Sequence, residues 1–81
     1  MHVRVRLGTG LARLAVAPVL TVELPEGATV ADLCGTVASE HPDLAAPLRS
    51  ALPVVAGTHA EPGRQLLQGD EVALLTPVAG G

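Results

Sequence analysis

Residues 19–42 read VLTVELPEGATVADLCGTVASEHP, and this stretch decides the fold. Its first part, residues 19–24, is rich in β-forming residues and alternates so that Leu20, Val22 and Leu24 share one face. The Pro-Glu-Gly that follows predicts a turn, because these residues end a strand and favour reversal of the chain. We therefore expect a half-buried strand that leads through a turn into the second part of the stretch.

The second part predicts a helix over Val30–Glu40. Thr29 supplies a capping hydroxyl, and Asp32 places a negative charge in the first turn. Pro42 cannot continue the helix and ends it. Apolar side chains fall on one helical stripe. The residues of this stripe are Val30, Leu33, Cys34, Val37 and His41.

On the N-terminal side, residues 2–7 alternate between polar and apolar side chains. Val3, Val5 and Leu7 share one face of an extended chain, opposite the histidine and the two arginines between them. The pattern predicts a half-buried strand, which we expect to pair as a hairpin with residues 19–24.

On the C-terminal side, residues 44–48 predict a short second helix, and residues 52–56 a buried strand. Residues 57–63 are punctuated by Gly and Pro and predict a loop around at most a short edge strand. Glu71–Leu75 is the last expected strand. One sheet packed on one main helix is an α+β fold of two layers. The expected core consists of Val5, Leu20, Val22, Leu33, Val37, Val72 and Leu74.

Composition excludes several classes of function. The 81 residues suffice for one domain, and its core must be built without Phe, Tyr or Trp. The formal charge is −3, with five arginines and no lysine, so a nucleic-acid binder with a basic patch and stacking aromatics is not expected. No apolar run approaches membrane-spanning length, and the N-terminus lacks the apolar core of a secretion signal. We expect a cytoplasmic protein that uses neither nucleic acid nor a membrane.

Candidate reactive side chains are few. His2, His41 and His59 lack ligand spacing, and the single Cys34 excludes an all-cysteine site, so we expect no metal. Cys34 lies on the apolar stripe of the helix, where a small buried hydrophobe is the expected role, rather than a reactive thiol that stores sulfur. Adjacent Asp70 and Glu71 are expected to form a turn rather than a catalytic pair. No catalytic constellation of the chain's own can be assembled.

The end of the sequence is the strongest functional signal. Residues 76–81 contain a proline and end in Gly80-Gly81, so we expect a flexible tail after a domain of residues 1–75. Glycine permits close backbone approach from both sides, as a narrow enzyme channel requires. The carboxylate of Gly81 would be freely accessible and ionised at neutral pH.

Residues 67–81, LQGDEVALLTPVAGG, resemble the end of the small subunit of molybdopterin synthase. The Gly-Asp-Glu-Val turn, the Pro-Val pair and the terminal Gly-Gly carry the resemblance, and residues 24–33, LPEGATVADL, and the helix stop at His41-Pro42 agree with it. That subunit belongs to the ubiquitin-like sulfur-carrier family, with the carriers of thiamine and cysteine biosynthesis. The resemblance implies a β-grasp fold, with a mixed sheet of four to five strands packed on one main helix.

For function, the resemblance implies that an E1-like enzyme uses ATP to adenylate Gly81. Sulfur from a donor protein then gives a C-terminal thiocarboxylate, with no cofactor bound to the carrier itself. The partner that accepts the sulfur would be a large synthase subunit or another sulfur-accepting enzyme. The residues that would thread into its active site are Pro77, Val78, Ala79 and Gly80.

Strand alternation adds a candidate partner surface. Leu75 and Ala73 should lie on the sheet face opposite Val72 and Leu74. Leu75, Val78 and the neighbouring strand residues would then form an exposed apolar patch that leads to the tail. Other functions remain open: a carrier for thiamine, cysteine or a specialised thio-metabolite, a ubiquitin-like protein modifier, or a β-grasp interaction module with an inert tail.

Overall fold

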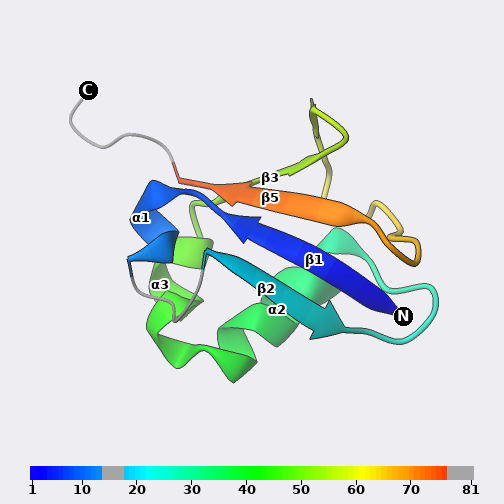
Figure 1. Ribbon diagram of the computed structural model, residues 1–81, viewed down its shortest axis with the longest axis horizontal. Coiled ribbons are helices and arrows are strands. Elements are labelled where there is room, and N and C mark those ends of the chain that lie inside the picture. The colour runs from blue at the N-terminus through cyan, green and yellow to red at the C-terminus, as the bar shows by residue number, and fades with distance from the viewer. Residues whose placement is uncertain (14–17, 77–81) are drawn as a thin grey trace.

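A computed structural model describes residues 1–13 and 18–76 of the chain. One five-stranded sheet has the spatial order β2-β1-β5-β3-β4. The described helices lie on one side of this sheet, as Figure 1 shows, and within residues 1–13 and 18–76 no helix covers the other side, which we call the open face. In the described parts of the chain, no helix is both long enough and apolar enough to cross a membrane.

Strands β1 (His2–Leu7) and β2 (Val19–Glu23) form the predicted antiparallel pair. Alternate residues of β1 are buried and exposed, as its pattern predicts, and Val3 lies opposite Val22. The connection begins with α1 (Thr9–Ala12), a single helical turn. Its Leu11 is fully buried, so even this short connection contributes to the core.

Helix α2 spans Val30–Glu40, with the predicted bounds. Its first turn is held by a capping box: the Thr29 hydroxyl accepts a hydrogen bond from the Asp32 amide at 3.2 Å, and the Asp32 carboxylate accepts one from the Thr29 amide at 2.9 Å. After the helix come a 3-10 turn at Pro42–Leu44 and the short helix α3 at Ala45–Leu48. Both are needed to reverse the chain toward the sheet.

The C-terminal half supplies β3 (Leu52–Val55), a short edge strand β4 (Thr58–His59) and β5 (Glu71–Leu75). Strand β5 lies in the middle of the sheet, parallel to β1 and antiparallel to β3. Hydrogen bonds from the Arg4 amide to the Asp70 carbonyl and from the Gly8 amide to the Leu74 carbonyl, both 2.9 Å, mark the two ends of the parallel pairing. The mixed sheet and the main helix confirm the expected β-grasp, ubiquitin-like α+β fold.

The core forms between the sheet and α2, mostly from the expected residues. Of those, Leu20 is only partly buried, because β2 is an edge strand. The prediction of a buried strand over residues 52–56 is wrong at both ends: Leu52 is 47% exposed, because its side chain lies on the open face, and Ala56 is exposed in the turn that follows Val55. Buried residues outside the expected core set are Val3, Leu7, Leu11, Leu24, Ala28, Val30, Leu44, Leu48, Val55, Ala60 and Leu66.

Candidate docking face

Strand β5 positions the candidate site, because it is the strand that runs toward the end of the chain. Val72 and Leu74 point into the core and are fully buried. Ala73 and Leu75 point to the opposite, open face, where Ala73 is partly buried and Leu75 is 42% exposed. The structure therefore places Ala73 and Leu75 on the predicted side of the sheet.

Neighbouring strands extend this surface into an apolar patch. In the antiparallel pairing of β3 with β5, Leu52 lies opposite Leu75, and Val54 lies opposite Ala73. Residues directly opposite on one face of a sheet have side chains in contact range. We call these four residues the open-face patch. Leu52 was not predicted here, because the continuous apolar run of residues 52–56 carries no alternation to assign its face.

Gly8, which follows β1, lies close to Leu75 of the open-face patch. A Cβ atom on Gly8 would lie 3.3 Å from Cδ2 of Leu75 and 3.4 Å from the carbonyl oxygen of Leu74. A side chain at this position would therefore have to displace Leu75. The glycine that ends β1 thus lets β5 continue alongside it to its last residue.

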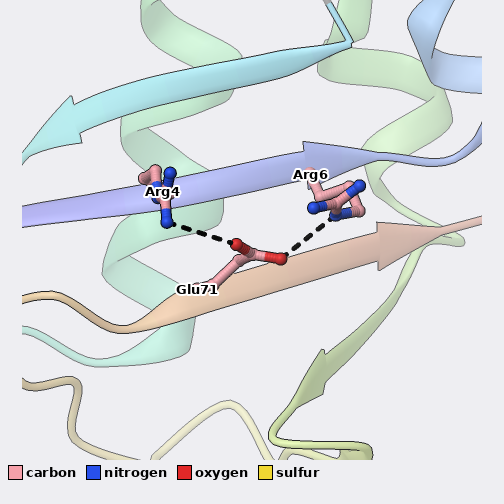
Figure 2. A network of polar contacts seen from close by, with 3 residues as sticks. All are labelled: Arg4, Arg6 and Glu71. Atoms are coloured by element: carbon pink, nitrogen blue, oxygen red, sulfur yellow. Dashed lines mark hydrogen bonds and ion pairs between the residues drawn. The ribbon is translucent and has the colours of Figure 1, made fainter.

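Beside the patch, two arginines of β1 share one carboxylate of β5. Figure 2 shows the Glu71 side chain between Arg4 and Arg6. The Arg6 Nε donates to Glu71 Oε1 at 3.1 Å, and an Arg4 guanidinium nitrogen lies 3.9 Å from Glu71 Oε2. Two cations share this one anion, and Glu23 of β2, which alternates with the buried Val22 and lies opposite His2, adds a second carboxylate to the same face. The sequence alone did not reveal the cluster, because it depends on the parallel register of β1 and β5.

The turn before β5 is formed as expected. The Asp70 carboxylate accepts a hydrogen bond from the Leu67 amide at 2.8 Å, and Gly69 takes a positive φ of 85°. The Gly69 amide donates to the His2 carbonyl at 3.0 Å, which ties the turn to β1. Asp70 therefore forms the turn, whereas Glu71 belongs to the ion-pair cluster.

Cys34 lies on α2 at the margin of the core, half-buried rather than fully buried as expected, because α2 covers the sheet with only part of its circumference. Burial raises the pKa of the Cys34 thiol. A thiol of raised pKa is protonated at neutral pH, which makes it a poor nucleophile. Within residues 1–13 and 18–76, no three His, Cys, Asp or Glu side chains gather into a group that could hold a metal ion.

The remaining predicted site residues lie outside the described part of the chain. They are Pro77, Val78, Ala79, Gly80 and Gly81. The boundary between a domain of residues 1–75 and a tail of residues 76–81 stays a prediction. The structure ends its description at Thr76, one residue after β5.

Solved structures with the same fold come from archaea and bacteria. Small archaeal modifier protein 1 of Haloferax volcanii superposes with a TM-score of 0.91 at 27% identity, over 100% of both chains. A putative molybdopterin converting factor, subunit 1, from Pyrococcus furiosus gives a TM-score of 0.87 at 26% identity, over 96% of this chain and 99% of that one. The complex of subunits 1 and 2 of the molybdopterin-converting factor from Helicobacter pylori shares the fold, with a TM-score of 0.73 at 21% identity and full coverage of both chains.

The sequence itself identifies the family. No curated protein sequence matches the chain significantly. The ThiS family matches residues 9–81, which include every described element after β1 and the closing Gly80-Gly81. The chain therefore belongs to the ThiS family of ubiquitin-like sulfur-carrier proteins.

Proposed function

We propose that this protein is a cytoplasmic sulfur carrier that is adenylated and then thiocarboxylated on the C-terminal carboxyl group of Gly81. The observation that carries the proposal is the family match, which continues to Gly81. An E1-like enzyme would join the carboxylate to the α-phosphate of ATP and release pyrophosphate. Sulfide supplied by a donor protein would then attack the carbonyl carbon and displace AMP, which leaves a C-terminal thiocarboxylate.

For the pathway, we propose the small subunit of molybdopterin synthase. The similarity to a putative molybdopterin converting factor subunit 1 supports this choice. In the Helicobacter pylori relative, subunit 1 is seen in a complex with subunit 2, so a large synthase subunit is the partner that we expect here. Residues 77–80 would lie in the active-site channel of that partner.

The open-face patch is the surface that we propose for docking on these partners. It is apolar, it is exposed at Leu52 and Leu75, and it ends where the chain continues toward Gly81. Arg4 and Arg6, which share Glu71, are exposed beside the patch and could pair with carboxylates of a partner.

The test is enzymatic thiolation followed by intact-mass measurement. The protein is incubated with the E1-like enzyme, ATP and a sulfur source, and we expect a mass increase equal to the exchange of one oxygen for sulfur. Deleting Gly81, or adding one residue after it, should abolish this product, because acyl activation tolerates little misplacement of the reacting carbon. Gly63→Ala is the matched control, since a Cβ there meets no atom within 4 Å. Thiolation of the truncated chain at the full rate would disprove the role of Gly81.

The docking surface has its own test. Leu75→Asp should weaken binding to the E1-like enzyme without unfolding the domain, because it places a charge in the patch. Leu67→Asp is the matched control, since Leu67 is 70% exposed and lies before β5 rather than at its end. Equal affinity of both variants would move the docking surface elsewhere.

Protein modification is the second candidate. The 27% identity with small archaeal modifier protein 1 over the full length favours it. In that case, Gly81 would form amide bonds to lysines of target proteins, and this chain could not extend itself through lysine, since it has none. Covalent adducts that depend on the E1-like enzyme and ATP, detected by mass, would distinguish a modifier from a carrier that acts only through its thiocarboxylate.

A further inference from the structure

A groove lies between the end of β2 and helix α2, away from the open-face patch. It has a volume of about 570 Å³ and is open to solvent. Leu24 and Pro25 form its strand side, and Ala31 and Gly35 are among the small residues on its helix side. Figure 1 shows α2 running along the β2 edge of the sheet, and the two elements are in contact.

Gly35 is unexplained by the packing of the domain. It lies in the middle of α2, where glycine lowers helix stability relative to alanine. Glycine is often retained in a helix because a neighbour leaves no room for a Cβ, but a Cβ on Gly35 would meet no atom within 4 Å. The space above Gly35 is part of the groove, so another chain could approach the helix backbone closely there.

The strand on the other side of the groove has a free edge. Among residues 1–13 and 18–76, β2 pairs with β1 alone. The Leu24 amide donates to Met1, and Leu20 and Val22, which alternate with it, also face β1. The amides and carbonyls of Val19, Thr21 and Glu23 therefore point away from the sheet. An unpaired edge of this kind accepts an additional strand.

The charge around the groove is negative. Asp32 and Glu40 line it, one in the first turn of α2 and the other at its last residue. Residues 14–48 contain five acidic residues and no Arg or Lys, and the segment of Arg64 contacts the start of α2 through the Val30 amide, at the Asp32 end of the groove. A positively charged occupant is complementary to it.

We propose that an extended segment of a partner protein binds here, adding a strand to the β2 edge and placing a small apolar side chain over Gly35. Arginine or lysine residues on either side of that apolar residue would pair with Asp32 and Glu40. This site shares no residue with the open-face patch or with the end of β5, so the partner could bind a carrier that is docked through that patch.

The test uses a phage-displayed library of random nonapeptides, selected on the full-length protein. We expect enrichment of sequences in which apolar residues are flanked by Arg or Lys. A synthetic copy of an enriched peptide should shift the amide resonances of Val19, Thr21, Glu23 and Gly35, and should protect the edge amides of β2 from hydrogen exchange.

Substitutions at Gly35 and Thr21 test whether the peptide binds at this site rather than elsewhere on the surface. Gly35→Gln fills the groove and should weaken peptide binding at least tenfold while raising the melting temperature, because it replaces a helix-interior glycine. Thr21→Pro removes one outward-facing amide and should weaken binding, whereas Thr21→Val, which keeps the amide, should not.

The proposal is overturned if no sequence is enriched over a parallel selection on Gly35→Gln, or if the enriched peptides are acidic. It is also overturned if their resonance shifts lie on Arg4 and Leu75 of the open face, or if the edge of β2 is occupied by a second copy of this chain, seen as a concentration-dependent dimer in sedimentation. Thiolation of Gly81 is measured in the same samples, so failure of the carrier function is recognised independently.

Discussion

Neighbouring leucines of β5 lie in opposite surroundings. Leu74 is fully buried under the helices, whereas Leu75, on the other face of the same strand, is 42% exposed. The division continues into β1, where Val5 is buried and Arg4 and Arg6 are exposed. The covered face buries apolar side chains away from water and so stabilises the fold. The charged and apolar side chains of the open face are partly in water, so they contribute little to the free energy of unfolding. The contrast separates residues that maintain the domain from residues available to a partner.

The largest expected effect on stability comes from comparing alanine substitutions of Leu74 and Leu75. Leu74→Ala should lower the free energy of unfolding by about 2–5 kcal/mol, because it leaves a cavity in the core. Leu75→Ala should lower it by less than about 1 kcal/mol, because the side chain is already partly in water. Urea denaturation of both variants measures the difference. Equal losses would mean that Leu75 belongs to the core.

The helix that covers the sheet depends on its capping box. Thr29→Ala should cost about 1 kcal/mol, because the Asp32 amide loses its hydroxyl acceptor. Ser39→Ala, an exposed change in the same helix, is the control and should not destabilise the domain. Circular dichroism during thermal unfolding would detect the effect, and an unchanged melting temperature for Thr29→Ala would show that α2 is held by packing alone.

Gly35 and Gly8 differ in the space available for an added Cβ atom, so alanine substitutions there should change stability in opposite directions. Gly35→Ala should raise stability by about 0.5–1 kcal/mol, because α2 gains helix propensity and the added methyl group meets open space. Gly8→Ala should instead destabilise the domain, because its Cβ would press on Leu75. Paired urea titrations check the opposite signs. A loss of stability in Gly35→Ala would contradict the open space above it.

On the open face, Glu71→Gln should cost between about 0 and 1 kcal/mol, since exposed ion pairs contribute little. The loss should shrink as salt is added, because the pairs with Arg4 and Arg6 are accessible to screening ions. Glu61→Gln, at an exposed loop position, controls for net charge. A loss that is large and independent of salt would mean that Glu71 acts through packing.

The smallest expected effect concerns Cys34, which lies at the margin between the buried core residues and the exposed residues. Burial raises its pKa above the ordinary value of 9.0, so the unfolded chain releases the thiol proton at a lower pH than the folded protein. Its contribution to stability is complete below pH 9.0 and is lost as the pH rises through the folded-state pKa. Urea titrations at neutral pH and at about pH 10 measure this effect. The free energy of unfolding should fall slightly more between the two pH values for the wild type than for Cys34→Ala.

Much of the fold follows from local signals in the sequence. The alternation of residues 2–7, the capping pattern at Thr29 and Asp32, and the stop at Pro42 predict the first strand and the bounds of α2, because each depends on neighbouring residues. The direction of Ala73 and Leu75 follows in the same way from strand geometry.

Other features depend on contacts between distant segments. Leu66 is buried and Leu67 is 70% exposed, although both lie in an irregular loop where no periodicity distinguishes them. Leu66 is positioned by the hydrogen bond of its amide to the Ala28 carbonyl, at 2.9 Å. The exposure of Leu52 likewise depends on the register of β3 against β5. Local sequence patterns do not predict whether these residues are buried, because their burial depends on which distant segments pair with them.

The parallel pairing of β1 with β5 has a consequence for how the chain folds. Arg4 pairs with Glu71, so the middle of the sheet joins segments from the two ends of the described chain. The β1–β2 hairpin and α2 can form early, but the centre of the sheet closes only after β5 has been synthesised. Contacts so distant in sequence slow folding, because the intervening loop must be ordered first. During translation, the edge of β1 that faces β5 therefore stays unpaired until β5 leaves the ribosome.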